Sequence, residues 1–516
     1  MKMSSSRRDF LARLLAAVSG RPGLVRGEVG ATPPSTFTDS RVLATLLPAP
    51  GQLGIRYVGS ATSHFQSEPI LWDDQGRPIL ASDWDVEVMR RVHGEPSRIP
   101  LADVSNLPRF LTRKEAYLAR SANLGENTYR FSLDFPRLCP TPGTFNDCLM
   151  DKYLMTLIRI RLLGREPFLT LHHFTMPRYL IQTDKHGNIT AGPWEHPAVA
   201  THFRFYVQRV VQCLADEKRL HGLLAIAGAS RKQADAIIDH GLVQYFMTIN
   251  EPAVIVFNGY VSGSSMPYKP RSLFKISPVL SRLAEAHEIA HDELKRGLRM
   301  QSQGPRVCVG HNWQYFDGFI GSLVNDIQMQ WTDRFERDGT HSDFLGLHYY
   351  FRRTIPLSAS AGRRRDYSDQ PQFGDIYPKG ILNVLASMHA RYPKKTIFVS
   401  EVGFSDHDDR RRPLWLLETL RYIIQAKAQG IPIDGILLWT LVNNFEWDLG
   451  MSQKFGLFSE GDLATPAVAR PGRLTSWEVW QACTAAITAP SFATLSRLQT
   501  LYGRAYEQYR RAGGKY

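Results

Sequence analysis

Two glutamates each follow directly on a run of apolar and β-branched residues. The run 246–249 leads through Asn250 to Glu251 and Pro252, and the run 396–400 leads to Glu401. Such runs predict buried strands. A carboxylate at the C-terminal end of a buried strand is held rigidly, at the edge where barrel enzymes keep their chemistry. Taken alone, Glu251 could be a surface residue beside a loop proline, but a second carboxylate in the same setting indicates acid/base and nucleophile chemistry on a glycosidic bond.

The segments that must position these carboxylates alternate between strand-like and helical patterns. Such alternation favours parallel strands joined by right-handed helical crossovers. Eight units predict a (β/α)8 TIM barrel of the α/β class, in a single domain with long βα loops and a C-terminal helical extension. An open doubly wound sheet is less favoured, because no G-x-G-x-x-G motif follows the first strand. The expected strands are 56–62, 128–132, 168–172, 245–250, 306–311, 344–348, 396–401 and 435–441.

The expected barrel domain covers residues 49–487. Residues 1–48 are rich in Arg, Ser, Pro and Gly, and we expect either a disordered extension or a twin-arginine-like signal built around Arg7 and Arg8. A cytoplasmic and an exported location therefore both stay open. Residues 488–516 are expected to form a basic helix and tail, with the helix over 491–509. This helix could pack on the barrel or dock on a membrane or partner.

Three long connections carry further expectations. Segment 63–127 follows the first strand and should lie over the mouth of the barrel. Segment 214–243 should add a helix over 231–240 on the face away from the chemistry. Segment 353–374 is rich in Ser, Arg and Asp and is expected to be mobile.

Composition excludes several classes of protein. No apolar run reaches the roughly 18 residues of a membrane-spanning helix, and five scattered cysteines without C-x-x-C spacing indicate neither a zinc site nor a disulfide framework. The formal charge is +13, partly in the clusters 363–365 and 410–412. This charge is either solvated in loops or attracted to an anionic surface. No nucleic-acid-binding motif accompanies it, so no nucleic-acid partner is predicted.

Several motifs in chain order resemble those of the family 1 β-glycosidases. Residues 248–252, TINEP, match the family's T-x-N-E-P, and residues 400–403, SEVG, resemble its T-E-N-G. Residues 129–132 read YRFS, and residues 438–447 read LWTLVNNFEW, close to the family's W-S-L-x-D-N-F-E-W. The resemblance implies a barrel that uses Glu401 as nucleophile and Glu251 as acid/base.

The resemblance also implies residues that support the nucleophile. Arg130 would hold the carboxylate of Glu401 ionised through charge-assisted hydrogen bonds. Tyr350 is expected to approach the same carboxylate, with Tyr349 as the alternate. Asn250 is expected to bind the sugar 2-hydroxyl, a contact that strengthens in the transition state.

A second implied group would hold the sugar itself. Gln66 and His173 are expected to bind sugar hydroxyls, and Trp439 to stack on the apolar face of the ring. Glu446 would accept hydrogen bonds from the 4- and 6-hydroxyls, and Trp447 would recognise the 3- or 4-hydroxyl. A carboxylate at position 446 favours a neutral glycone over a phosphorylated sugar.

Some positions depart from the family pattern. Val402 and His348 both stand where the family usually has Asn, and Phe174 stands where it usually has Trp. His172 and His173 are adjacent, but neighbours on a strand point to opposite faces. No metal and no cofactor are therefore predicted.

Three functions are considered from the sequence. The first is a retaining β-glycosidase that hydrolyses β-O-glycosides of a neutral hexose such as glucose, galactose or fucose. The second is a transglycosylase or galactosyltransferase acting on glycolipid at a membrane surface, because segment 399–457 also resembles the galactolipid galactosyltransferase branch of the family. The third is a carbohydrate-binding relative without catalysis. Retention of Glu251, Glu401 and Arg130 favours an enzyme over the third.

Overall fold

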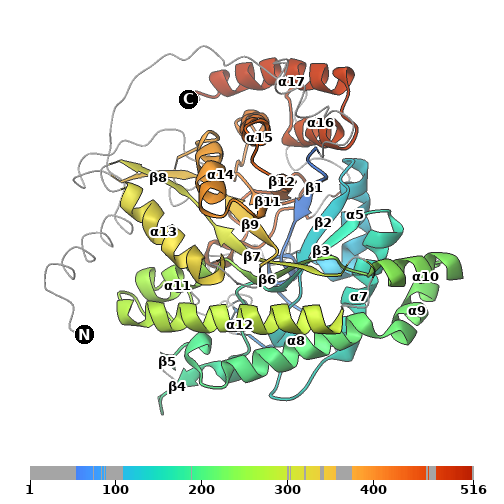
Figure 1. Cartoon of the computed structure of the whole chain (residues 1–516), viewed down its shortest axis with the longest axis vertical. Coiled ribbons are helices and arrows are strands. Elements are labelled where there is room, and N and C mark those ends of the chain that lie inside the picture. The colour runs from blue at the N-terminus through green and yellow to red at the C-terminus, as the bar shows by residue number, and fades with distance from the viewer. Residues whose placement is uncertain are drawn as a thin grey trace, which may run out of the picture.

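In the computed structural model, eight parallel strands close into one barrel surrounded by helices (Figure 1). The structure describes residues 54–71, 73, 75–82, 84–85, 88, 108–186, 189–298, 302, 304–318, 321–336, 342–355, 375–460, 463 and 472–513. Around the barrel the strand order is β1-β12-β11-β9-β7-β6-β3-β2. The (β/α)8 barrel predicted from the alternating pattern is thus confirmed.

The barrel strands agree with the expected ones to within two residues at each end. Contiguous apolar and β-branched runs mark them well, because strands of a parallel barrel are buried on both faces. The strands are β1 (Tyr57–Ala61), β2 (Thr128–Ser132), β3 (Glu166–His172), β6 (Tyr245–Asn250), β7 (Arg306–Asn312), β9 (Phe344–Tyr349), β11 (Thr396–Val402) and β12 (Ile433–Trp439).

Large side chains fill the barrel interior toward the amino ends of the strands. The rings of Tyr57, Phe168, Tyr245, Phe344 and Phe398 meet at centroid distances of 5.2 to 6.3 Å. Edge-to-face and offset contacts of this kind add stability beyond the area they bury. The interior is therefore a packed core at this end, and its open space lies toward the carboxyl ends of the strands.

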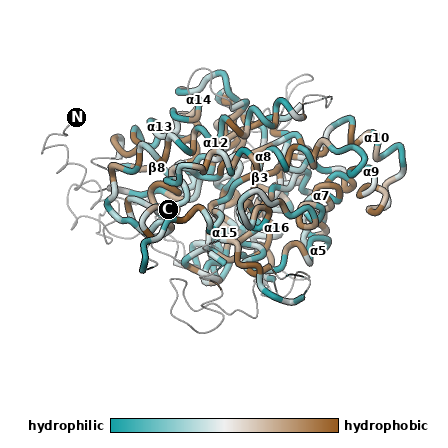
Figure 2. Tube along the Cα trace, turned by 90° about the horizontal axis from the view of Figure 1, so that it is seen from below, coloured by the Kyte–Doolittle hydropathy of each residue, from teal (hydrophilic) through white to brown (hydrophobic). Residues whose placement is uncertain are grey.

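An outer layer of helices covers the barrel wall. Figure 2 shows hydrophobic and hydrophilic residues alternating along these helices, as expected where one face packs on the strands. The helices are α5 (Phe110–Asn123), α7 (Asp147–Leu162), α8 (Val199–Ala215), α12 (Ile276–Gly297), α13 (Gly321–Glu336), α14 (Gly380–Arg391), α15 (Arg412–Ala428) and α16 (Ser476–Thr488). None of the helices within the described residues is long and apolar enough to span a bilayer.

Segment 214–243 contains two helices, where the sequence predicted one. The expected helix is α10 (Arg231–His240), and α9 (Glu217–Ile226) precedes it. The added helix starts because Asp216 Oδ1 accepts a hydrogen bond from the backbone N–H of Arg219 at 3.0 Å, which is an N-terminal cap. In Figure 1 both helices lie on the right, away from α11 (Pro252–Val256), which follows a strand end on the left.

Helix α17 (Phe492–Arg511) lies on the outside of the barrel against α15 and α16. Its apolar side buries Leu495, Leu498 and Tyr509. Gln508 Nε2 also donates to the backbone oxygens of Leu474 and Asp409, at 3.0 and 3.2 Å. Packing on the barrel, the first of the two expected roles, thus accounts for the apolar face of this helix.

The basic cluster at 410–412 is not simply solvated loop charge. Arg412 is buried at the start of α15, and its guanidinium lies 3.0 Å from Asp409 Oδ1. It also donates to the backbone oxygens of Lys454 and Gly456, at 2.7 and 3.1 Å. Arg412 therefore fastens the loop after β12 to α15. The expectations for residues 1–48, for the cluster 363–365 and for most of segment 353–374 fall outside the described residues.

Candidate active site

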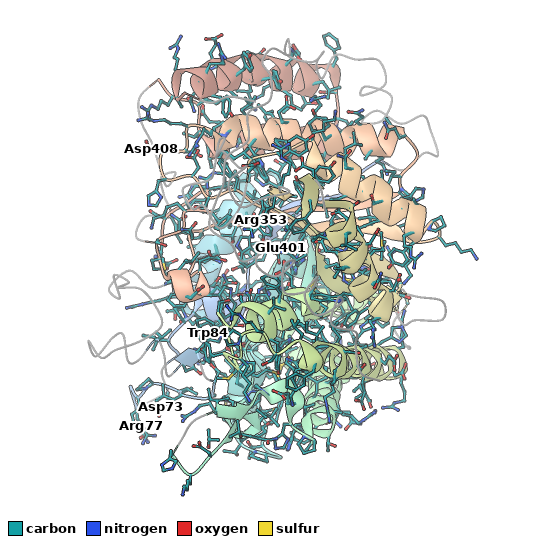
Figure 3. All side chains as sticks on the ribbon, turned by 90° about the vertical axis from the view of Figure 1, so that its left-hand side faces the viewer. Asp73, Arg77, Trp84, Arg353, Glu401 and Asp408 are labelled. Carbon is teal, nitrogen blue, oxygen red and sulfur yellow. The ribbon has the colours of Figure 1, made fainter. Side chains whose placement is uncertain are left out.

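A cavity of about 1790 Å³ opens at the carboxyl ends of the strands. Both glutamates line it, as do Trp84 from the loop after β1 and Trp439 at the end of β12. Figure 3 looks onto this side of the barrel, with Glu401 near the centre. Trp84 lies in segment 63–127, so part of that connection does reach the mouth, as predicted.

Glu251 lies just beyond β6, where the chain turns into α11. Its backbone has φ 48° and ψ 61°, a left-handed conformation that disfavours a long side chain, and Pro252 follows at the first helical position. The side chain is 8% exposed. Burial raises the pKa of the Glu251 carboxyl to about 7, although Asn312 and Arg130 act in the opposite direction. A carboxyl group of this kind can both give and take a proton near neutral pH.

Glu401 lies near the end of β11 and receives two strong hydrogen bonds. Arg130 Nη1 lies 2.6 Å from its Oε1, and the Tyr350 hydroxyl donates to its Oε2 at 2.5 Å. Gly403 makes room for this contact, because a Cβ there would lie 2.8 Å from the Tyr350 ring and 2.6 Å from the Trp439 oxygen. Tyr349 points elsewhere and donates to the backbone oxygen of Tyr377 at 2.6 Å. Tyr350 is thus the tyrosine beside the expected nucleophile.

The two carboxylates face each other across His348. One oxygen of Glu251, one oxygen of Glu401 and one nitrogen of His348 all lie within 4.8 Å of one another. Retaining glycosidases hold their two carboxyl groups about 5 Å apart, whereas inverting enzymes separate them by about 6.5 Å or more. The contact between Glu251 and Glu401 fits the shorter of these two separations.

Arg130 connects the Glu401 carboxylate to the neighbouring strand ends. It is fully buried on β2, and its Nη2 donates to Asn250 Oδ1 at 2.6 Å. Its Nε donates to Thr170 Oγ1 at 2.8 Å on β3. Because these bonds fix the guanidinium plane, the positions of Glu401 and Asn250 are set by one rigid cation.

The same three groups, Glu251, His348 and Glu401, are the kind that can surround a metal ion. Here Arg130 already provides the positive charge beside Glu401. His172, the other histidine considered from the sequence, lies on the opposite side of the strand against Trp194, at 5.2 Å between ring centroids. We therefore assign no metal to the site.

Glu446 lines the cavity and is partly exposed. Gln66 Nε2 donates to its Oε2 at 3.0 Å. Burial, together with the nearby negative charge of Glu401, raises the pKa of the Glu446 carboxyl to about 8. Gln66 and Glu446 thus come from opposite ends of the chain to form one polar pair that faces the cavity.

Aromatic rings form the walls beside this pair. The His173 ring stacks near parallel to Trp439, at 5.8 Å, and to Trp447, at 6.2 Å. Phe174 meets Trp447 edge-on at 5.2 Å. Flat apolar faces beside polar groups are the usual combination for holding a sugar ring. The structure therefore brings all ten expected site residues to one cavity or its wall.

Away from this polar pair the same cavity has a mostly apolar part, which we call the outer chamber. Helix α13 and the segments after β6 and β7 line it, with Val254, Phe257, Phe316, Ile327 and Trp331 among the lining residues. Phe274 also lines it and is 76% exposed. The outer chamber lies on the side of Glu251.

Two residues at the site were not identified from the sequence. Asn312 Nδ2 donates to Glu251 Oε1 at 2.8 Å, and Gln314 Nε2 donates to Asn312 Oδ1 at 2.8 Å. Asn312 ends β7, one residue beyond the expected strand. The rule that polar residues at strand ends face the mouth would have found it. His348 was noted only as a departure from the family pattern.

A barrel with two facing carboxylates at the carboxyl ends of its strands is the arrangement of a glycoside-processing protein. A model of glycosyl hydrolase family 1 matches residues 57–221 and 339–466, which is more than half of the chain. The chain belongs to this family.

Two relatives show how far individual members of the family differ from this chain in sequence. A chloroplastic β-glucosidase-like SFR2 protein of Oryza sativa subsp. japonica is 25% identical over 77% of this chain. The chloroplastic galactolipid galactosyltransferase SFR2 of Arabidopsis thaliana is 25% identical over 67% of it. These matches cover 62% and 53% of the two relatives' own lengths. The β-glucosidase structure from Pyrococcus furiosus shares the fold, with a TM-score of 0.69 at 20% identity, over 87% of this chain and 98% of that one.

Proposed function

We propose that this protein is a retaining β-glycosidase that hydrolyses β-O-glycosides of a neutral hexose. The observation that carries the proposal is the pair Glu251 and Glu401, held within 4.8 Å through one oxygen each and in different surroundings. Arg130 and Tyr350 stabilise an ionised Glu401, while burial favours a protonated Glu251. Separate environments for two carboxyl groups are what an acid and a nucleophile require.

In the first step a Glu401 oxygen attacks the anomeric carbon. The bond from that carbon to the leaving oxygen breaks, and the proton of Glu251 passes to that oxygen. A covalent glycosyl ester of Glu401 forms, and Glu251 becomes ionised.

In the second step a water molecule attacks the same carbon. Its proton goes to Glu251, which now acts as base, and the ester bond to Glu401 breaks. Loss of the charge on Glu401 during the first step removes repulsion and so makes an ionised Glu251 easier to hold. Two displacements at one carbon retain the β-configuration.

A mechanism-based label tests the proposal directly. An activated 2-deoxy-2-fluoro β-glucoside, and separately the galactoside, should add one fluorosugar to the protein, on the peptide that contains Glu401. The fluorine slows the second step more than the first, so the ester accumulates. E401Q is the matched control and should acquire no label. If neither sugar labels the folded wild type and no aryl glycoside is cleaved, the proposal is wrong.

The glycone is expected to be neutral because of Glu446. A phosphate group at the 6-position would approach a carboxyl group that offers no positive charge and that repels it once ionised, above about pH 8. Comparing kcat/KM for aryl β-glucoside, β-galactoside and β-fucoside names the preferred sugar. A preference for a 6-phosphorylated glycoside would contradict the proposed role of Glu446.

A second candidate is transfer of a hexose to a glycolipid, and the outer chamber is the observation that favours it. Its apolar lining suits an acyl or alkyl group better than water alone. One of the relatives is named as a galactolipid galactosyltransferase. Transfer would share the first step and differ only in the acceptor that attacks the ester.

Product analysis separates the two reactions. The wild type is incubated with a monogalactosyl lipid in vesicles, and free galactose and oligogalactosyl lipid are both measured. Release of free sugar alone supports hydrolysis, and lipid carrying a second galactose supports transfer. Neither product, together with tight sugar binding and no label on Glu401, would support the third hypothesis of a carbohydrate-binding protein.

A further inference from the structure

His348 lies between the two carboxylates and is fully buried on β9. Its Nδ1 lies 2.8 Å from Glu251 Oε1 and 3.4 Å from Glu401 Oε2. Its Nε2 lies 3.5 Å from Arg130 Nη1. An imidazole in this position touches the acid/base, the nucleophile and the cation that holds the nucleophile.

The partners of His348 select one tautomer of its ring. Arg130 offers only N–H groups, and its Nη1 already donates to Glu401 Oε1 and to the backbone oxygen of Ser400, so a proton on Nε2 would find no acceptor there. Nδ1 faces an oxygen of each glutamate, and Glu401 Oε2 already accepts from Tyr350. A proton on Nδ1 satisfies both sides, whereas a proton on Nε2 would set N–H against N–H. Burial lowers the pKa of His348 to about 3, so the ring is neutral and carries one proton.

A second donor reaches the same oxygen of Glu251, and its orientation is also fixed. The backbone N–H groups of residues 350 and 351 donate to Gln314 Oε1, at 3.1 and 2.8 Å. Gln314 Nε2 therefore points at Asn312 Oδ1, and Asn312 Nδ2 must point at Glu251 Oε1. The amide of Asn312 cannot turn over without losing the contact with Gln314.

Glu251 Oε1 is thus surrounded by two donors, Asn312 Nδ2 and His348 Nδ1, each at 2.8 Å. We propose that His348 is a positioning residue which, together with Asn312, keeps the acid proton of Glu251 on Oε2. An oxygen that accepts two N–H bonds behaves as the carbonyl oxygen of the acid, so the hydroxyl is the other one. The proton then has one position from which to reach the leaving group.

This inference rests on the proposed function for its kinetic meaning but not for its geometry. Other charged or titratable groups around Glu251 and His348 come from several strands: Arg130 from β2, His173 after β3, His311 from β7, Glu401 from β11, Tyr350 after β9 and Glu446 after β12. Because none of these groups is itself substituted when His348 alone is changed, we expect a change in the pH profile of the variant to come from the loss of this ring.

Two variants distinguish the role of the Nδ1 donor from that of the whole ring. H348N places a side-chain amide near the Nδ1 position and keeps a donor for Glu251, while H348L removes both nitrogens. The pH dependence of kcat/KM is measured with an aryl glycoside whose leaving group needs a proton, and with a dinitrophenyl glycoside that needs none.

For H348L we expect the alkaline limb of the first profile to move up by about one pH unit, since a lost donor disfavours the ionised form of Glu251. We also expect kcat/KM to fall roughly 10-fold more for the poor leaving group than for the dinitrophenyl substrate. In H348N the alkaline limb of kcat/KM should stay within a few tenths of a pH unit of its wild-type position. An unmoved limb in H348L, or equal losses for both substrates, would overturn the proposal.

A measurement without turnover keeps this test separate from the test of the proposed function. The protein is labelled with ¹⁵N-histidine, and the His348 signals are assigned by their absence in H348N. We expect a protonated Nδ1 and an unprotonated Nε2 that do not titrate near neutral pH. The opposite tautomer would mean that Glu251 donates to Nδ1, and would overturn the proposal even in a fully active enzyme.

Discussion

The guanidinium of Arg130 lies 2.6 Å from Glu401 Oε1, and both side chains are buried. Removing one partner of a buried pair leaves an uncompensated charge and costs about 3–5 kcal/mol. R130M should therefore lower the free energy of unfolding by that amount in urea titrations and abolish labelling of Glu401. In the double variant R130M/E401Q part of the lost stability should return, because the carboxylate that was left without its partner is gone.

Arg412 provides the control for this variant. It is a second buried arginine, paired with Asp409 away from the cavity. R412M should also lose stability, but its folded fraction should still take the label on Glu401. Equal loss of labelling in both variants would mean that Arg130 acts only through folding.

Tyr350 and Tyr349 offer a matched pair of neighbouring tyrosines. The Tyr350 hydroxyl donates to Glu401 Oε2, whereas the Tyr349 hydroxyl donates to the Tyr377 backbone. A hydrogen bond to a charged group contributes about 1.5–3 kcal/mol, so Y350F should lower kcat/KM roughly 10- to 100-fold. Y349F should leave kcat/KM near the wild-type value and lose only stability. If both variants behave alike, the contact with Glu401 is not the one that matters.

The buried acid Glu251 makes stability depend on pH. Its pKa is raised from 4.5 to about 7, so between these values the folded protein holds a proton that the unfolded chain has lost. The contribution is fully present below pH 4.5 and is lost as the pH rises through about 7.

E251Q stays neutral and should escape this loss. Against the wild type it should gain about 1–3 kcal/mol at pH 8 and nothing at pH 4, measured by urea titration at both values. E288Q, at an exposed position on α12, should show no such difference between the two pH values. A gain for E251Q at pH 4 as large as at pH 8 would contradict the buried-acid explanation.

The outer chamber predicts a preference for apolar aglycones. Each methylene group that it buries contributes up to about 0.8 kcal/mol, so KM for alkyl β-glycosides should fall by about 2- to 4-fold per added CH₂ until the chamber is full. W331A should flatten this trend, because Trp331 lines the chamber. W477A, on the barrel exterior in α16, should not. A KM independent of chain length would count against glycolipid as substrate.

The sequence predicted the barrel closely, because buried parallel strands form contiguous apolar and β-branched runs. It also placed Glu251 directly after one such strand and Glu401 near the end of another. It could not show the order of hydrogen bonds around Glu251. The orientation of Asn312 depends on Gln314, which in turn depends on the backbone at residues 350 and 351. Contacts of this kind depend on the spatial register of separate strands, which no local pattern records. The outer chamber was missed for the same reason, since its wall is the surface of α13.

Glu251 keeps a left-handed backbone, φ 48°, in a position that would suit glycine better. A search for heat-resistant variants would select glycine or asparagine here, since each relieves both the backbone strain and the buried acid. Such a variant would outlast the parent in a heating assay and yet have lost its proton donor. At this one position, the substitutions that best resist heating are therefore expected to be those with the least activity.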